Sequence, residues 1–170
     1  MNLNALSKIS YGMFVISSKK NNKFNGQIAN TVFQVSAQPP MIAISINKQN
    51  LTHKYISESK VFTAAVLSEE TPMKYIGLFG FKSGINTDKF KECESKIGVT
   101  GARIATDYAV AYFEAEVVGS LDAQTHTIFT GKIVASEIIS EKEPMTYAYY
   151  HKIKGGLSPK TAPTYIVNQQ

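Results

Sequence analysis

The clearest pattern along the chain is an alternation of small or apolar residues with larger or polar residues between positions 109 and 117. One face of an extended strand would carry Ala109, Ala111, Phe113, Ala115 and Val117, and the other face would carry Tyr112, Glu114 and Glu116. A period of two residues is typical of a half-buried antiparallel strand. We therefore predict such a strand here, with residues 127–138 as its partner.

Four shorter apolar runs predict further strands, over residues 11–17, 32–36, 41–46 and 61–67. The segment KKNNKFNG after the first run predicts a turn, because Asn and Gly tolerate left-handed backbone conformations. Pro39 and Pro40 lack the N–H group that a strand ladder needs. They therefore predict a bend or a sheet edge between the second and third runs.

Signals for helices are fewer. Residues 51–59 predict a helix with Asn50 or Thr52 as its N-cap, and Thr71-Pro72 predicts the start of a helix that runs to residue 79. Residues 88–95 and 145–151 are further candidates. Many short strands with a few helices, and no alternating βαβ pattern, predict a mainly β fold: an antiparallel barrel decorated by helices.

The length of 170 residues fits one domain over residues 1–170. Residues 154–170 are rich in Gly, Pro, Ser and Thr and predict an extended C-terminal arm. Cys93 is the only cysteine, so it cannot close an internal disulfide, which points to a reducing cytoplasm. Neither a secretory signal nor a membrane-length apolar run is visible, so we expect a soluble, cytoplasmic protein without a membrane partner.

The formal net charge of +5 is consistent with an anionic ligand or partner. The lysines are scattered and do not alternate with aromatic residues as they would in a groove for single-stranded nucleic acid. A solvated basic surface is the favoured interpretation, and no nucleic-acid partner is expected.

Several kinds of active site are excluded by their missing motifs. The chain has no GxxxxGK[ST] phosphate loop, no GxGxxG dinucleotide fingerprint and no GxSxG elbow. His53, His126 and His151 are far apart and lack the spacing of a zinc site, so no metal is expected.

Two clusters of polar residues remain as candidates for ligand binding. The first runs from Asn25 to Thr31 and continues with Gln34 and Ser36; it offers neutral donors and acceptors that suit a planar heterocycle. Its alternative interpretation, a polar turn beside an exposed strand face, is favoured on composition alone. The second runs from residue 47 to 53 and combines Lys48 and Thr52 with a helix start, which suits a phosphate. Ordinary helix capping is the commoner explanation, but the two clusters together are stronger evidence than either alone.

Two single residues are weaker candidates. His126 lies at the start of a predicted strand, where a lone histidine is more often structural than catalytic. Tyr165 ends the arm and would lay its ring on a ligand or on a neighbouring subunit; a disordered tail is the alternative.

Three segments carry a family resemblance that covers nearly the whole chain, from Ile9 to Tyr165. They are NGQIANTVFQVSAQPPMIAISINKQNLTH, FGFKSGINTDKF, and the strand start His126…Phe129…Gly131. Together they resemble the flavin reductase-like family, and in particular its flavoredoxin-like branch. The resemblance implies an FMN-binding split β-barrel that forms a homodimer and holds FMN non-covalently near the subunit interface.

The resemblance also implies roles for individual residues. Those expected near the flavin ring are Ala29, Asn30, Thr31, Gln34, Ser36 and Ala37. Those expected at the ribityl chain and phosphate are Asn47, Lys48, Asn50, Thr52 and Lys89. His126 would lie near the isoalloxazine or the entry of the nicotinamide, and Tyr165 near the flavin.

Two departures from the family pattern bear on substrate preference. Ile28 stands where many relatives have Thr, and Ile-Asn-Thr follows Ser83-Gly84 where relatives often have Arg. Some relatives carry a fused rubredoxin. This chain has no paired cysteines for one, so a rubredoxin or iron–sulfur partner would be a separate protein.

Three functional hypotheses follow. The first is an oxidoreductase in which NAD(P)H reduces bound FMN, which then passes electrons to free flavin or a redox protein. The second is an FMN-containing electron carrier that does not react directly with NAD(P)H. The third is a basic nucleic-acid-binding module without a cofactor. The choice between NADH and NADPH, the final acceptor, and the retention or exchange of FMN stay open at this point.

Overall fold

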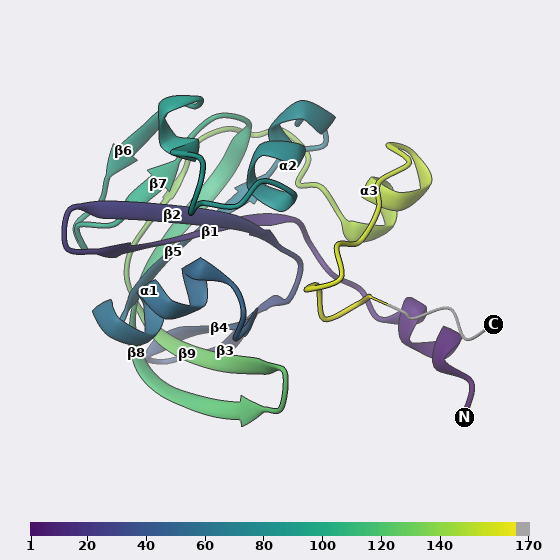
Figure 1. The fold of residues 1–170 in the computed structure, drawn as a ribbon, viewed down its shortest axis with the longest axis horizontal. Coiled ribbons are helices and arrows are strands. Elements are labelled where there is room, and N and C mark those ends of the chain that lie inside the picture. The colour runs from purple at the N-terminus through teal and green to yellow at the C-terminus, as the bar shows by residue number, and fades with distance from the viewer. Residues whose placement is uncertain (166–170) are drawn as a thin grey trace.

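The computed structural model describes residues 1–165 as a curled antiparallel sheet with helices at its ends (Figure 1). The sheet has the strand order β2-β1-β5-β8-β9-β4-β3. Its strands are β1 (Phe14–Lys20), β2 (Lys23–Ala29), β3 (Val32–Ala37), β4 (Pro40–Asn47), β5 (Val61–Leu67), β8 (Ala109–Ala123) and β9 (His126–Ile138). A separate hairpin pairs β6 (Ser95–Ile97) with β7 (Arg103–Ala105). The helices are η1 (Leu3–Lys8), α1 (Leu51–Ser59), α2 (Met73–Gly80), η2 (Lys89–Lys91) and α3 (Tyr147–Lys152).

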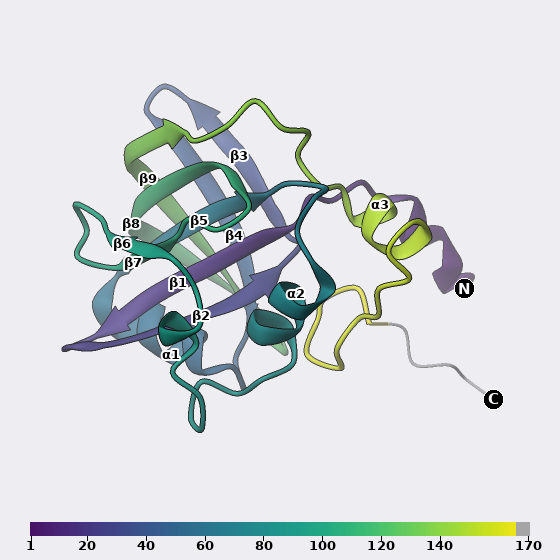
Figure 2. The same cartoon turned by 90° about the horizontal axis from the view of Figure 1, so that it is seen from above.

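The sheet curls into a split barrel whose two halves cross when seen from above, and it stays open between its edge strands (Figure 2). The two edge strands, β2 and β3, follow each other along the chain and are joined only by Asn30 and Thr31. This confirms the predicted mainly β, antiparallel split barrel.

Two apolar cores hold the fold together. One lies inside the barrel, where Ile16, Ile44 and Phe62 pack around Ile56 of α1. The other lies outside it, where Tyr75 and Phe79 of α2 pack with residues that include Met13 and Ile104. Helices α1 and α2 are thereby fixed on either side of β2, and the space between them becomes the candidate site.

Most predicted strands and helices are confirmed, with small shifts of their ends. The segment KKNNKFNG is one exception: only Asn21 and Asn22 form the turn, and β2 begins at Lys23. Asn21 has a φ of 52°, so one residue in the left-handed region is enough to reverse the chain. The prediction missed β2 because a polar strand that lines a site lacks the usual apolar alternation.

The half-buried strand at 109–117 is also corrected. Tyr112 and Glu114, which were expected on an open face, are almost fully buried, with Glu114 only 1% exposed. The loop between β6 and β7 covers this face, since the carboxylate of Glu114 accepts hydrogen bonds from the backbone of Val99 and Thr100.

Two helix predictions need revision. Residues 88–95 form only the short η2, because the backbone N–H of Glu94 donates to Asp107 at 2.8 Å and β6 begins at the next residue. The helix at Thr71-Pro72 begins one residue later than expected, with Pro72 as N-cap, because the Thr71 hydroxyl donates to the carbonyl of Ser68 at 2.7 Å instead. Within residues 1–165 no helix is both long and apolar enough to span a membrane.

Candidate functional site

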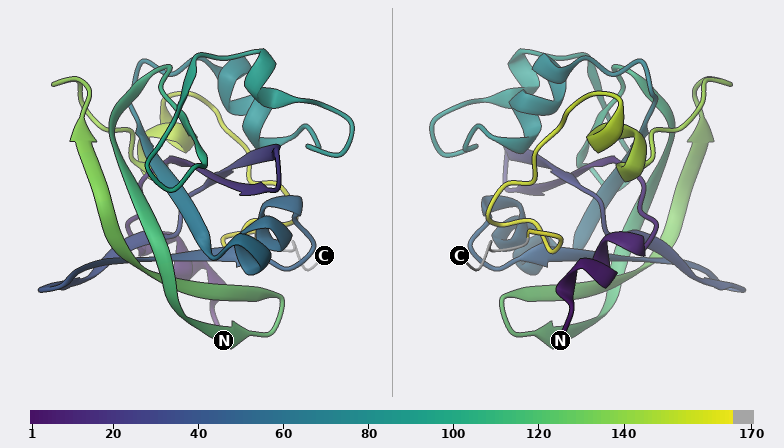
Figure 3. Two further views of the ribbon diagram at one scale, coloured as in Figure 1. Left: turned by 90° about the vertical axis from the view of Figure 1, so that its left-hand side faces the viewer. Right: turned by 90° about the vertical axis from the view of Figure 1, so that its right-hand side faces the viewer.

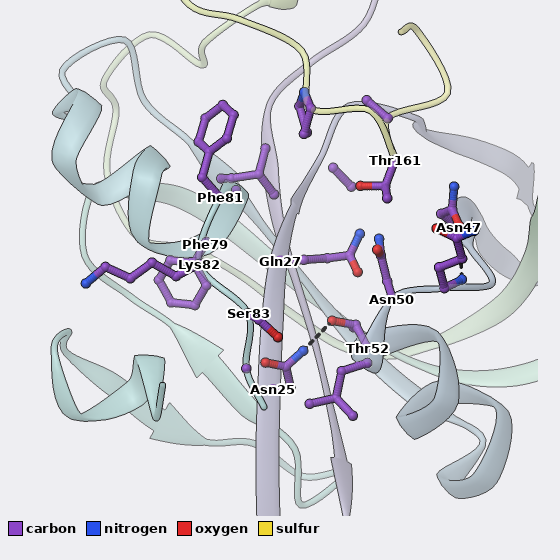
Figure 4. Close-up of a pocket in the computed structure, with 18 of the residues that line it drawn as sticks. Asn25, Gln27, Asn47, Asn50, Thr52, Phe79, Phe81, Lys82, Ser83 and Thr161 are labelled. Carbon is purple, nitrogen blue, oxygen red and sulfur yellow. Dashed lines mark hydrogen bonds between the residues drawn. The ribbon is translucent and has the colours of Figure 1, made fainter. Parts of the chain in front are cut away.

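A cavity of about 360 Å³ lies between β2, the end of β4, the start of α1 and the segment that follows α2 (Figure 4). Its remaining wall is the C-terminal arm, which descends from α3 past β2 toward α1 (Figure 3, right). Residues from five separate parts of the chain therefore meet around one space.

The lining combines neutral polar, basic and apolar side chains. Its neutral polar side chains are Asn25, Gln27, Asn30, Ser45, Asn47, Gln49, Asn50, Thr52, Ser83 and Thr161. Lys82, Lys89 and Lys160 add positive charge, while the described lining contains no Asp or Glu. Phe79, Phe81 and Tyr147 supply aromatic surface. Such a lining suits an anionic ligand with a flat ring that carries hydrogen-bonding groups.

The start of α1 opens onto this cavity. Asn50 is the N-cap residue, but its side chain makes no capping hydrogen bond, and Figure 4 shows it lying next to Gln27. The first N–H groups of a helix have no partner within the helix and form a positive end. An uncapped helix start beside a cavity can bind a phosphate.

The loop after α2 is fixed against β2 by a close contact. The amide of Asn25 donates to the hydroxyl of the fully buried Thr52 at 2.8 Å. A Cβ on Gly84 would lie 1.9 Å from the Asn25 side-chain oxygen, so only glycine lets the loop approach this closely. This contact brings Ser83 and Lys82 to the edge of the cavity.

Lys89 is the most unusual group in the lining. Its side chain is buried, with 4% of the residue exposed, and its ammonium donates to the carbonyls of Gly26 at 2.8 Å and Phe79 at 3.3 Å. It makes no ion pair with a carboxylate within residues 1–165. Burial lowers the pKa of Lys89 to about 8. A buried ammonium without a counter-ion favours an anion in the adjoining cavity.

Gln27 carries a second unsatisfied group. Its buried side-chain oxygen accepts no hydrogen bond from any residue that the structure describes. Buried polar atoms in native proteins nearly always have a partner. A ligand donor in the cavity would provide one.

A second cavity, of about 430 Å³, adjoins the first and shares with it Ser45, Asn47, Lys160, Ala162 and Pro163. His126 lies in its wall with one nitrogen 2.8 Å from the Thr125 hydroxyl, and its Nε2–H donates to the carbonyl of Thr161 at 3.2 Å. Burial lowers the pKa of His126, and the bond to Thr161 opposes that shift. The arm therefore separates two connected cavities.

The structure brings together only part of the predicted set. The first cavity contains Ala29, Asn30, Asn47, Asn50, Thr52 and Lys89, and the second contains His126, Tyr165 and again Asn47. Thr31 lies next to the first cavity and donates to the Asn30 side chain at 3.1 Å.

Besides Thr31, four predicted residues lie outside both linings. Lys48 points to the surface, where its ammonium lies 2.7 Å from the carboxylate of Asp122. Gln34, Ser36 and Ala37 lie on the edge strand β3, away from the cavities of this chain. Side chains on a strand, or just after its end, can point to either face of the sheet, and the sequence motif does not specify which face these four residues occupy.

Sequence reasoning also missed several lining residues. They include Ser45, Ser83 and Tyr147, whereas Asn25 and Gln27 belong to the first polar cluster, where the sequence assigned them no individual role. A signal was present for Ser83, because it lies in the glycine-rich FGFKSG segment that contributed to the family resemblance. No comparable signal marks Tyr147, which reaches the cavity through tertiary packing. Among residues 1–165 no group of three metal-binding side chains comes together.

Comparison with known proteins shows the family to which this fold belongs. The chain matches the flavin reductase like domain over residues 6–157. It is 47% identical to the high molecular weight rubredoxin of Moorella thermoacetica over 170 residues, which are 100% of this chain and 74% of that protein. It is 46% identical to the ferric-chelate reductase (NAD(P)H) of Archaeoglobus fulgidus over 166 residues, which are 98% of each protein.

Solved structures agree in fold. The NADH:FAD oxidoreductase of Streptomyces globisporus superposes with a TM-score of 0.76 at 23% identity, covering 84% of each chain. The flavoredoxin of Methanosarcina acetivorans gives a TM-score of 0.70 at 24% identity, covering 79% of this chain and 74% of that one.

The fold and the matches define a flavoprotein of the flavin oxidoreductase class. Specifically, the chain belongs to the flavin reductase-like domain family, which confirms the family resemblance.

Proposed function

We propose that residues 1–170 form one cytoplasmic domain that binds FMN non-covalently and uses NAD(P)H to reduce it. The observation that carries this proposal is the set of unsatisfied polar groups around the first cavity. Lys89 lacks a counter-ion, Gln27 lacks a donor, and Asn50 leaves its helix start uncapped. A ligand with a phosphate and a polar ring would satisfy all three, so the residues present fit FMN.

The phosphate end would lie beside the start of α1. Asn50 and Thr52 flank the free N–H groups there, and Lys89 supplies a cation from the opposite wall, whereas Lys82 is paired with Glu92 at 3.3 Å. Helix starts and lysines both stabilise phosphate charge. Lys48 has no part in this site, because it is paired with Asp122.

The ring end would lie toward β2 and β4. Gln27, Asn30 and Asn47 offer neutral amide groups, and Ala29 leaves room for a ring to approach. Bound FMN would supply the hydride-accepting chemistry, whereas the protein binds it, orients it and limits its contact with water. The adjoining second cavity would admit the nicotinamide, with His126 in its wall.

An exposed apolar surface on the sheet supports a homodimer. Large apolar side chains are exposed on β3, β8 and β9: Phe33, Val35, Leu121, Val134 and Ile138. An exposed apolar area of this kind marks a site of protein association. Gln34, Ser36 and Ala37 lie on the same edge strand as Phe33, so they would reach a flavin only across such an interface.

Reduced FMN would pass electrons to free flavin or to a separate rubredoxin or iron–sulfur protein. The similarity to a protein named high molecular weight rubredoxin supports a redox-protein acceptor. The second candidate function is an electron carrier that does not use NAD(P)H. It is favoured by the arm, whose residues Lys160, Ala162 and Pro163 stand between the two cavities and limit access.

The visible spectrum tests the proposal. We expect purified protein to be yellow, or to become yellow with added FMN, and to bleach rapidly when NADH or NADPH is added without oxygen. Yellow protein that neither nucleotide bleaches would favour the carrier. Colourless protein that takes up no FMN would contradict the proposal.

A further inference from the structure

The C-terminal arm is fastened at both ends of its described part, residues 154–165, although this part contains no helix or strand. Next to α3, the Tyr150 hydroxyl donates to the carbonyl of Leu157 at 2.9 Å, and the His151 ring donates to the carbonyl of Gly156 at 2.7 Å. Gly156 lies against the Tyr150 ring so closely that a Cβ there would come within 2.1 Å of it. The beginning of the arm is therefore fixed by the last helix.

The far end is fastened to the barrel. The Asn30 amide donates to the Thr164 hydroxyl at 2.9 Å, and the Thr164 hydroxyl lies 2.8 Å from that of Tyr147. Tyr147 in turn bonds to Ser158. One threonine thus joins the end of β2, helix α3 and both ends of the arm in a single chain of hydrogen bonds.

Between these fastenings the arm crosses the site. Residues Pro159–Pro163 line the first cavity, and three of them also line the second. Only one hydrogen bond ties this middle part to the barrel, from His126 to the carbonyl of Thr161. Pro159 and Pro163 restrict the backbone, which lowers the entropy lost when the arm is ordered.

We propose that residues 158–164 are a strap that holds FMN as a resident group, and that Thr164 is the positioning residue that keeps the strap closed. This inference rests on the proposed function, because it concerns the exit of the ligand from the same cavity. The strap is attached by a few bonds and can lift without unfolding the barrel. FMN leaves only while it is lifted, so the bonds at Thr164 set the rate of release.

The test is Thr164→Val, which keeps the shape of the side chain and removes its hydroxyl. FMN release is measured by loading the protein, removing free flavin and following the flavin retained over time by rapid gel filtration. Loss of two hydrogen bonds is expected to raise the release rate by about tenfold. The FMN association rate and the midpoint of thermal unfolding of the FMN-free protein should not fall. Thr106→Val is the matched control, because the Thr106 side chain lies outside both cavities and makes no hydrogen bond to the described residues.

Each outcome has one meaning. Faster release with unchanged or faster association supports the strap. An unchanged release rate contradicts it, and so does faster release accompanied by slower association or a less stable FMN-free protein, since either would show damage to the cavity itself. Failure of the unaltered protein to bind FMN would contradict the proposed function instead.

Discussion

Two buried charged side chains, Glu114 and Lys89, differ in how completely the fold satisfies their charges. The carboxylate of Glu114 on β8 accepts hydrogen bonds from the Val99 N–H at 3.0 Å, the Thr100 N–H at 2.9 Å and the Thr100 hydroxyl at 2.7 Å. The ammonium of Lys89, beside the cavity, has two carbonyl acceptors and no carboxylate. One charge is fully satisfied by the fold, whereas the other is left for a ligand to satisfy.

The difference distinguishes a buried charge that stabilises the fold from one that is available to bind a ligand. Glu114 holds the β6–β7 loop against the barrel, so it contributes to the stability of the fold. Lys89, together with the unpaired oxygen of Gln27, costs stability when the cavity holds no anion. We expect substitutions at Glu114 to lower stability, and substitutions at Lys89 or Gln27 to weaken ligand binding without lowering stability.

The largest effect is expected at Glu114. Glu114→Ala leaves three donors without their acceptor and should lower the free energy of unfolding by about 3 kcal/mol, measured in urea. The exposed neighbour Glu116 is the control, and Glu116→Ala should stay within about 0.5 kcal/mol. If Glu114→Ala lowered the free energy of unfolding no more than Glu116→Ala does, the loop would not depend on the Glu114 carboxylate.

The buried Lys89 should give the FMN-free protein an unusual pH dependence. Its pKa is lowered from 10.5 to about 8, so the unfolded chain holds the proton over a range where the folded chain has lost it. The free energy of unfolding should therefore rise with pH above 8, by about 2 kcal/mol between pH 8 and 10. The free energy of unfolding is measured against pH for the unaltered protein and for Lys89→Met, and the difference between the two curves removes the contribution of the other titratable groups. A difference that does not change with pH would mean that Lys89 is not desolvated.

The same variant should weaken binding without weakening the fold. Lys89→Met removes the buried cation and should raise the Kd for FMN by about thirtyfold, which is about 2 kcal/mol. The free energy of unfolding at pH 7 should not decrease, because a buried charge without a counter-ion is replaced by an apolar chain. Unchanged FMN affinity in a calorimetric titration would show that Lys89 does not serve the ligand.

A smaller effect is expected at Gln27. Gln27→Met removes an oxygen that has no partner in the described structure, so the free energy of unfolding should hardly change. The loss of one bond to the ligand should raise the Kd for FMN by about tenfold. Equal affinities of variant and unaltered protein would place the ring of the ligand elsewhere.

The smallest effect is expected at Lys48. The side chains of Lys48 and its partner Asp122 are both exposed, and such pairs contribute at most about 1 kcal/mol. Lys48→Ala should leave the affinity for FMN within about twofold, by the same titration. A loss as large as that of Lys89→Met would restore Lys48 to the phosphate site that its sequence position suggested.

The sequence predicted the parts of the fold that depend on apolar periodicity. Strand β5 and helix α1 have the predicted bounds. Strand β2 was missed because its residues serve the cavity, and Asn25 and Gly26 interrupt the apolar pattern that would have marked it. The buried face of β8 was also missed, since the loop that covers Glu114 comes from elsewhere in the chain.

The candidate site was predicted in the same partial way. Asn30, Asn47 and Thr52 belong to polar clusters at strand and helix ends, and they meet in the cavity. Lys48 lies in the same cluster but points outward, because neighbouring residues on a strand end face opposite ways. Thr161 and Tyr147 reach the site only through the path of the arm, which no local pattern encodes.

The most direct test of the central claim compares FMN with riboflavin, which has the same ring but lacks the phosphate. Calorimetric titration of the FMN-free protein should show one FMN per chain, with riboflavin bound at least about thirtyfold more weakly, since only FMN offers an anion to Lys89 and the start of α1. Equal affinities, or no binding of either, would contradict the claim that the unsatisfied charge beside this cavity holds a flavin phosphate.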